Sequence, residues 1–445
     1  MRPNKARPKS RATRKAPQVE EKAFLTPEAR RWLMWGALAA VIVMGVVLRT
    51  SNLGGVPTRS PDERIYLSYA ARVAHGGLGA VPPLFQMYEG NSQMWSYPVP
   101  NRITYVLMVA AAMKMGFQDV AAGVAVSCLS SCLSLVLVAW IGIRFFNRWI
   151  ALAAAAFLGC SLCELAMAQR AWQDAAFGFF GLLLLYVTLE LARQPRRILW
   201  YPSFFGLGAF SLLTKQTGVV TYGLCAVWVL WTVLGKERSW KWTAVVVGGG
   251  LASIAITLGI WGALAGGVGT ALSALNHSLH PEGAGRAYVD AVSTGPWYQF
   301  PYLLWLASPL TALTGLLGIA VAVRPSGLLR GVDRAPALPD MDAAACVTLL
   351  ALGFVAFASF VPGMQNLRYI CPANGAICLL AGLGIWYAMA LARQALPGTG
   401  AQVVFVLGVL AVGIGAMRDY RAFTSVAASG MQDLPAAWVR QNMEQ

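Results

Sequence analysis

The stretch WLMWGALAAVIVMGVVL, Trp32–Leu48, is an uninterrupted apolar run that ends at Arg49. Its length lies at the lower end of the roughly 17–25 residues that a helix needs to cross a bilayer. The run is longer than the apolar core of a typical signal peptide, and no small-residue cleavage pattern closes it. We therefore predict a retained helix that anchors the chain in a membrane.

Apolar runs of similar length recur through the whole sequence. Hydrophobic residues make up 57% of the chain and charged residues 12%, with a mean hydropathy of +0.56, whereas soluble domains carry about 25% charged residues. This composition predicts an all-α polytopic membrane protein with about eleven transmembrane helices. We expect these helices at residues 32–49, 120–143, 149–167, 174–192, 199–213, 218–234, 242–262, 302–323, 344–361, 370–391 and 401–417.

The basic residues indicate how the chain is oriented. The sequence has 35 Lys and Arg residues against 19 Asp and Glu, a net charge of +16. They lie mainly in residues 1–31 and in short segments between apolar runs, a pattern that orients membrane helices and does not indicate nucleic-acid binding. Residues 1–31 are predicted to be a disordered cytoplasmic tail that can also contact anionic lipid headgroups.

The apolar run at 101–116 decides the topology. If it crossed the membrane, the basic loops near Arg144, Arg193, Lys236 and Arg324 would lie opposite the basic tail, against the positive-inside rule. We therefore predict a surface or re-entrant helix, so that the first outer loop contains short surface helices. Residues 32–417 then form the transmembrane domain, with outer loops at 50–119 and 263–301 and a short outer tail at 418–445.

This topology gathers carboxylates on the outer face. Because no large soluble domain exists, any chemistry must take place at the membrane boundary, on a substrate that is lipid-linked or can reach it. We expect a multi-pass protein of the plasma (inner) membrane with a cytoplasmic N-terminus and an active face that is periplasmic or extracellular. The acids assigned to that face are Asp62, Glu63, Glu89, Asp119, Asp174, Glu282, Asp290 and Asp419.

The segment Ser60-Pro61-Asp62-Glu63 has the pattern of a helix start. Ser60 fits the N-cap, Pro61 the first helical position, and Glu63 the acid that completes a capping box. The cap accounts for Glu63 but does not require Asp62, although an acid in the first turn is favoured by the helix dipole. Of the two acids, Asp62 is therefore the candidate for a catalytic role on the outer face.

Several motifs in this order resemble the C-type glycosyltransferase superfamily, in particular the branch of bacterial dolichyl-phosphate-mannose-type protein mannosyltransferases and aminoarabinose transferases. The resemblance extends over most of the chain, and it rests on the order of the motifs and their agreement with the charge-derived topology. The motifs are Asp62-Glu63, Tyr66, Gly76-Gly77, Gln169-Arg-Ala-Trp-Gln-Asp174, Leu213-Thr-Lys-Gln-Thr-Gly218 and Arg368-Tyr-Ile-Cys-Pro372.

The resemblance implies that a sugar moves from a polyprenyl-phosphate donor to an acceptor protein, glycan or lipid, with inversion at the anomeric carbon. Asp62 would be the general base. Lys215 and Arg368 would lie beside the donor phosphate, where cations stabilise the developing negative charge. Many members have a Lys or His before a proline pair, but here the segment reads Trp95-Ser-Tyr-Pro-Val-Pro-Asn-Arg102, so Arg102 is assigned that role.

Asp174 has two interpretations. It is an ordinary acid at a helix start, or it is a second acid of the catalytic site. Together with Asp62 it could then hold a divalent cation, Mg or Mn, through oxygen ligands. Family members with and without a metal are both implied, so no cofactor is assigned.

Further candidates for substrate contact lie in the outer loops. His277 and His280 are three residues apart, a spacing that fits one metal ion but is equally ordinary in a solvated loop. Glu164 falls inside a predicted helix, where a carboxylate is suspected of function. The full set of contact candidates is Glu63, Tyr66, Tyr97, His277 and His280.

A polytopic transporter or flippase for a lipid-linked or small polar substrate is the alternative. It predicts internal repeats and helices interrupted by Gly or Pro, and the sequence displays little of either. A hydrolase is disfavoured because neither a GxSxG nor an HExxH motif is present. The sugar, the prenyl length and the acceptor cannot be read from the sequence.

Overall fold

A computed structural model describes residues 26–51, 53, 60–280, 286, 289–290, 293–324 and 339–395, and a few isolated positions between 407 and 418. This part of the chain is built of helices and turns, without a β-strand. Residues 1–25 of the predicted cytoplasmic tail lie outside the described residues. Residues 419–445 of the predicted outer tail also lie outside them. Most of the predicted helix 401–417 also lies outside the described residues.

Seven helices of the described part are long and apolar enough to cross a membrane, and two bent helix pairs raise this number to nine. Each of the seven coincides with a predicted span, which confirms the all-α polytopic class. The count of eleven is not confirmed, because α9 (Trp200–Thr214) has only 15 residues. The seven are α1 (Pro27–Thr50), α5 (Asp119–Ile141) with η3 (Gly142–Phe146), α8 (Asp174–Arg193), α10 (Gly218–Trp231) with η4 (Thr232–Lys236), α11 (Trp240–Ala265), α17 (Met341–Phe360) and α18 (Cys371–Ala395).

Two predicted spans are broken instead of straight. Residues 149–167 divide into α6 (Arg148–Gly159) and α7 (Leu162–Ala168), bent by 58°, because Ser161 leaves the helix and caps a new one. Residues 302–323 divide into α14 (Gln299–Ala307) and α15 (Pro309–Val323), bent by 115°. Pro309 cannot continue a helix and disfavours helical geometry at the residue before it.

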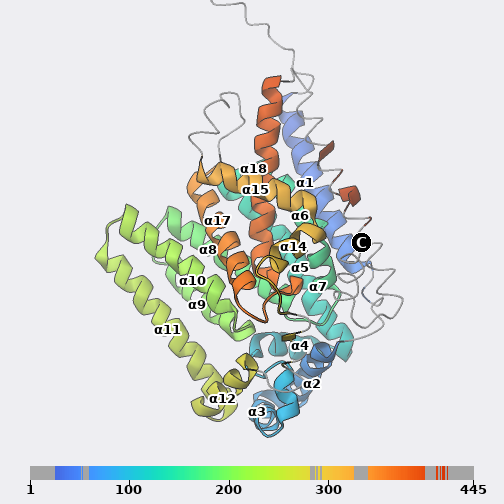
Figure 1. Ribbon diagram of the computed structural model, residues 1–445, viewed down its shortest axis with the longest axis vertical. Helices are drawn as coiled ribbons and strands as arrows, with labels where there is room; N and C mark the ends of the chain where they lie inside the picture. The colour runs from blue at the N-terminus through green and yellow to red at the C-terminus, as the bar shows by residue number, and fades with distance from the viewer. Residues whose placement is uncertain are drawn as a thin grey trace, which may run out of the picture.

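The segment between α1 and α5 forms the short surface helices expected from the charge argument. Figure 1 shows them at one end of the molecule, beside α12 (Val268–Leu279). The run predicted not to cross is α4, whose 12 residues are too few to span. The helices are α2 (Pro61–Gly76), η1 (Gly77–Ala80), α3 (Val81–Glu89), η2 (Ser92–Ser96) and α4 (Ile103–Lys114).

The capping prediction for α2 is confirmed. The Glu63 backbone N–H donates to the Ser60 hydroxyl, the Ser60 backbone N–H donates to the Glu63 carboxylate, and Pro61 occupies the first turn. The helix ends at Gly76 because Gly77 adopts a φ of 64°, which favours glycine. Both ends of α2 are therefore fixed by its sequence, and Asp62 lies in its rigid first turn.

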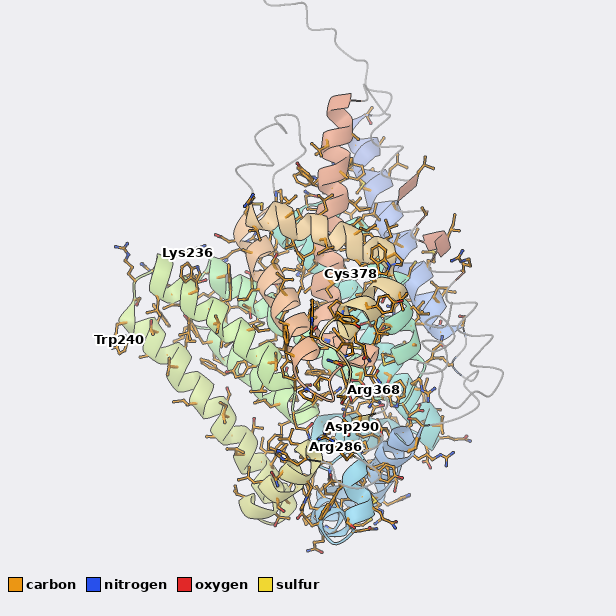
Figure 2. The ribbon with its side chains drawn as sticks, viewed as in Figure 1. Lys236, Trp240, Arg286, Asp290, Arg368 and Cys378 are labelled. Carbon is orange, nitrogen blue, oxygen red and sulfur yellow. The ribbon has the colours of Figure 1, made fainter. Side chains whose placement is uncertain are left out.

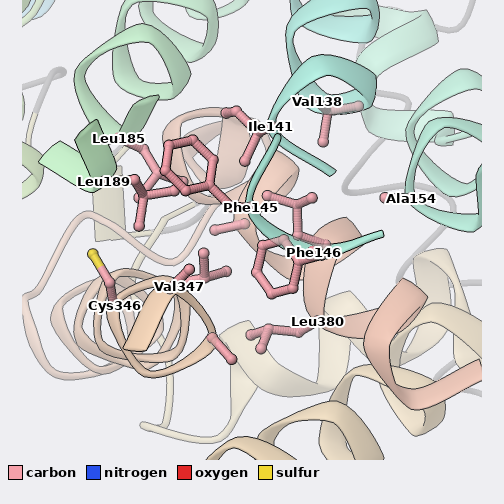
Figure 3. Packing of buried hydrophobic residues seen from close by; sticks show 14 of the residues in the cluster. Val138, Ile141, Phe145, Phe146, Ala154, Leu185, Leu189, Cys346, Val347 and Leu380 are labelled. Carbon is pink, nitrogen blue, oxygen red and sulfur yellow. The ribbon is translucent and has the colours of Figure 1, made fainter. Parts of the chain in front are cut away.

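The helices pack around α18, which contacts α6, α8, α15 and α17. Figure 3 shows this core, in which Phe145, Leu185, Val347 and Leu380 meet from different helices. The backbones of α15 and α18 touch, since a Cβ atom added at Gly384 would lie 1.9 Å from the Thr314 carbonyl oxygen. Small residues at helix crossings are typical of membrane bundles, where close packing replaces the hydrophobic effect.

A fully buried arginine supports the break between α6 and α7. The Arg49 guanidinium donates to the carbonyl oxygens of Leu158 and Gly159 at 3.0 Å each, at the end of α6. It also donates to the Ser131 hydroxyl at 2.8 Å, and Ser131 donates to the Glu164 carboxylate at 2.8 Å. Glu164, suspected of function from its position, is thus part of a buried polar network that stabilises the bundle.

We expect Arg49→Leu to destabilise the protein by about 3 kcal/mol, because it leaves buried polar groups without a partner. Unfolding by titration with sodium dodecyl sulfate measures the loss. The exposed Arg72→Leu is the matched control and should change little. When Arg49→Leu and Glu164→Gln are combined, the loss of unfolding free energy should be smaller than the sum of the two single losses. Full additivity would show that the network does not act as a unit.

Candidate active site

A cavity lies where the surface helices meet the ends of α8 and α18, with about 740 Å³ of empty space that includes open solvent. Figure 2 shows Arg368 near this end, while Lys236 and Trp240 mark the opposite end of the peripheral helices. The cavity brings together most of the site residues predicted from sequence. Its lining is Asp62, Tyr66, Trp95, Tyr97, Pro98, Arg102, Trp172, Gln173, Asp174, Lys215, Ser278, Val289, Ser293, Arg368 and Tyr369.

Asp62 forms an ion pair with Arg368. The Nη1 atom of Arg368 donates to Asp62 Oδ2 at 2.9 Å, across a separation of 306 residues in the sequence. The carboxylate is 26% exposed and the guanidinium 18%, so the pair lies at the boundary between protein and cavity. The Nε atom of Arg368 is buried without a hydrogen-bond partner. The pair therefore leaves part of the donor capacity of Arg368 unused.

Asp174 forms a second ion pair, with Lys215. The Nζ atom donates to Asp174 Oδ1 at 2.6 Å, and both side chains are at most 5% exposed. Asp174 begins α8, as predicted, and Lys215 follows α9 directly. Two buried charges are tolerated only when each neutralises the other. Neither charge could therefore be buried at this position without the other.

Two aromatic side chains position the cations. Lys215 Nζ lies 4.2 Å from the centre of the Tyr369 ring, and the Tyr369 hydroxyl accepts from Arg368 Nη2 at 3.3 Å. The Arg368 guanidinium also lies 5.3 Å from the Trp172 ring centre. Such cation–π contacts are stronger away from water. Sequence reasoning missed both aromatic residues, although each lies inside a motif that carried the family resemblance.

Arg102 takes part in a hydrogen-bond chain. Its guanidinium donates to the Tyr66 hydroxyl, which donates to Gln173 Oε1 at 2.6 Å. Its Nε atom donates to Gln216 Oε1 at 3.2 Å. Burial lowers the pKa of Arg102, but Tyr66 and Asp62 raise it by more, so the pKa of the guanidinium lies above its usual value. Burial raises the pKa of Tyr66. The side-chain hydrogen-bond partners of the Arg102 cation, Tyr66 and Gln216, are thus both neutral.

Glu63 is fully enclosed and does not line the cavity. Besides the cap of α2, its carboxylate accepts from Arg170 Nη2 at 2.6 Å and from the backbone N–H of Ala171 at 2.8 Å. It therefore fastens the first turn of α2 to the turn before α8. This contact holds Asp62 and Asp174, which lie on these two elements, at the same cavity.

The histidines lie outside the cavity lining, whereas Tyr97 is part of it. The His277 ring stacks on Trp95 with 3.6 Å between centres, and its Nε2 atom is 3.7 Å from a Glu89 carboxylate oxygen. The exposed His280 contacts Asn276 of its own helix. Neither histidine lines the cavity, although His277 packs on Trp95, which does, and the substrate contact predicted for them stays a prediction.

The two carboxylates considered for a divalent cation are already paired with side-chain cations. Within the described residues, no three His, Cys, Asp or Glu side chains gather as a metal site. Asp62 and Asp174, the carboxylates considered for this role, already hold Arg368 and Lys215. A metal ion would have to displace two ammonium or guanidinium groups and leave them in low dielectric, which is unfavourable.

The fold and the site define a polytopic membrane protein with a charged cavity at one end, and this fold is similar to that of solved membrane glycosyltransferase structures. In apo form, ArnT from Cupriavidus metallidurans is 16% identical over 90% of this chain and 77% of that chain, with a TM-score of 0.57. ArnT bound to undecaprenyl phosphate is 14% identical, with coverages of 88% and 77% and a TM-score of 0.52.

A third similar structure is the oligosaccharyltransferase from Archaeoglobus fulgidus in apo form. It is 12% identical, with a TM-score of 0.59, and the match covers 90% of this chain and 56% of that chain. No family model and no curated protein sequence matches the chain. The likeness to solved structures thus confirms the predicted resemblance at the level of the fold.

We expect Lys215→Met and Asp174→Asn each to destabilise the protein by about 3–5 kcal/mol, because each leaves a buried charge or dipole without its partner. The double variant should recover most of this loss. Unfolding in detergent, followed by tryptophan fluorescence, measures all three. If the double variant were as unstable as the sum of the single ones, the two side chains would not stabilise each other.

Proposed function

We propose that this protein is a membrane glycosyltransferase that moves a sugar from a polyprenyl-phosphate donor to an acceptor at the outer face of the membrane, with inversion. The observation that carries the proposal is the charge of the cavity. Three cations, Arg102, Lys215 and Arg368, line it against two carboxylates, Asp62 and Asp174. A site with one surplus positive charge, at the boundary of a membrane bundle, suits a ligand with an anionic head and a lipid tail.

The donor phosphate would be bound by exchange of ion pairs. A phosphate that enters the cavity competes with Asp62 for Arg368, whose planar fork binds phosphate oxygens in pairs. Arg102, which has no carboxylate partner within 4 Å in the described part of the chain, supplies the surplus charge. Lys215 stays with Asp174, since both are buried. Donor binding would then release Asp62 from its salt bridge.

Once released from Arg368, the Asp62 carboxylate would be free to accept a proton as the general base. The acceptor oxygen or nitrogen attacks the anomeric carbon while its proton moves to the Asp62 carboxylate. The bond between that carbon and the phosphate oxygen breaks, and the phosphate keeps the electron pair. The new negative charge develops beside Arg368 and Arg102, which stabilise it. A single displacement from the opposite side inverts the anomeric carbon.

The comparisons support a lipid-phosphate donor. One of the similar structures is ArnT bound to undecaprenyl phosphate, and its fold is shared over most of this chain. The placement on the outer face rests on the charges, because the cavity lies at the end of the bundle opposite the loops that hold Arg144 and Lys236. The positive-inside rule puts those loops in the cytoplasm. The plasma (inner) membrane, an active face that is periplasmic or extracellular, and an acceptor protein, glycan or lipid complete the proposal.

A transporter or flippase is less well supported. The two broken helix pairs, α6 with α7 and α14 with α15, resemble the interrupted helices of transporters. None of the residues that line the charged cavity belongs to either pair. At the break between α6 and α7, Arg49 instead satisfies the carbonyl oxygens of Leu158 and Gly159.

Asp62→Asn is expected to lower the rate of sugar transfer from a radiolabelled polyprenyl-phosphate sugar by about 10²–10⁴-fold, the usual effect of losing a general base. Binding of the donor should be unchanged or tighter, because Arg368 no longer has a competing carboxylate. Asp119→Asn, an exposed acid at the start of α5, is the matched control. Near wild-type turnover in the Asp62 variant would refute its role as base.

An excess of EDTA should leave transfer unchanged, because Arg368 and Lys215 already neutralise both carboxylates of the cavity. Steady-state transfer by purified protein, before and after treatment, measures the effect. Loss of activity that Mg or Mn restores would contradict this expectation and return the acid pair to a metal-binding role.

A further inference from the structure

A second cavity lies at the other end of the bundle, away from the proposed active site. It is a groove between the first turns of α1 and the junction of η3 and α6, with about 1040 Å³ of open space. Arg193, at the last turn of α8, contacts Arg144 of the same η3 and Asp340 before α17. Asp174, at the first turn of α8, lies in the charged cavity. The length of a membrane-spanning helix thus separates the two cavities.

The floor of the groove is apolar. Met34 and Leu38 of α1 are buried in it, and Phe146 closes it from η3. The neighbouring side chains Trp32 and Leu33 of α1 are 72% and 58% exposed, as expected for residues that face lipid. A groove with this lining, beside helix surfaces of this kind, is suited to an acyl chain.

Two arginines that line this groove have no carboxylate partner in the described part of the chain. Arg144, Arg193 and Lys236 at this end are each paired with a carboxylate, respectively Glu190, Asp340 and Asp342. In contrast, the exposed Arg31 and Arg148, which line the groove, have no carboxylate within 4 Å among the described residues. Trp35 and Trp149 lie beside them in the lining. The groove therefore combines an apolar floor with unpaired guanidinium groups.

We infer that the groove binds an anionic phospholipid, with its phosphate at Arg31 and Arg148 and an acyl chain along Met34, Leu38 and Phe146. Guanidinium groups bind phosphate oxygens in pairs, and basic pockets between membrane helices are suited to anionic headgroups. The segment before Pro27 is positively charged overall, although it contains Glu20 and Glu21. A zwitterionic lipid offers no net charge to the two arginines.

Native mass spectrometry of the detergent-purified full chain tests the inference, with phosphatidylglycerol and phosphatidylcholine added in turn. Each arginine near a lipid phosphate contributes about fivefold in binding, so we expect a preference for phosphatidylglycerol of about thirtyfold. Arg31→Gln/Arg148→Gln should abolish the preference. Both side chains are exposed, so the variant should fold.

The matched control is Arg197→Gln/Lys241→Gln, which removes the same charge from exposed positions outside the groove and should keep the preference. Leu38→Trp, which fills the groove without a change of charge, should weaken retention of phosphatidylglycerol at least tenfold. Equal retention of the two lipids, or an equal loss in the control, would overturn the inference. So would displacement of phosphatidylglycerol by undecaprenyl phosphate at equal concentration, which would make the groove a carrier site.

Discussion

The structure depends on the partners that buried charges and broken helix ends find inside the protein. Neither lipid nor a packed helix bundle can solvate a carboxylate or a peptide carbonyl. Arg49 is such a partner where α6 ends within the bundle, since it satisfies the carbonyl groups exposed by the break. Lys215 and Asp174 are partners of each other beside the cavity. Such partners thus allow a helix to break here and charges to be buried.

Such a partner also links the surface helices to the bundle. Glu63 is enclosed, and its carboxylate joins the start of α2 to Arg170 and the turn before α8. A residue that from sequence looks like half of a local cap therefore also makes a long-range contact. The consequence for function is geometric, because Asp62 and Asp174 are carried by the two elements that Glu63 joins. The same Glu63 side chain thus caps α2 and positions the two acids of the cavity.

The cavity keeps one of its five charges without a partner of opposite sign. Its two carboxylates have cationic partners, while the Arg102 guanidinium donates hydrogen bonds to the neutral Tyr66 and Gln216 among the described residues. An unpaired cation at a solvent-accessible, partly apolar cavity has a free-energy cost that an anionic ligand removes. The proposed donor phosphate would supply that anion, and its arrival would rearrange the pair between Asp62 and Arg368. Binding of the donor phosphate and release of the Asp62 base would thus be coupled through the charges of the cavity.

The sequence by itself determined most of the apolar helices and the start of α2. Hydropathy located the apolar helices, basic loops separated the two ends, and the pattern at Ser60 fixed the start of α2, because these are properties of neighbouring residues. Only the tertiary structure decided the partners. The pair of Asp62 with Arg368 spans 306 positions, the role of Trp172 and Tyr369 arises from their place beside cations, and the bend before Pro309 separates two helices of one apolar run. Such contacts follow from how helices pack, and no local pattern encodes them.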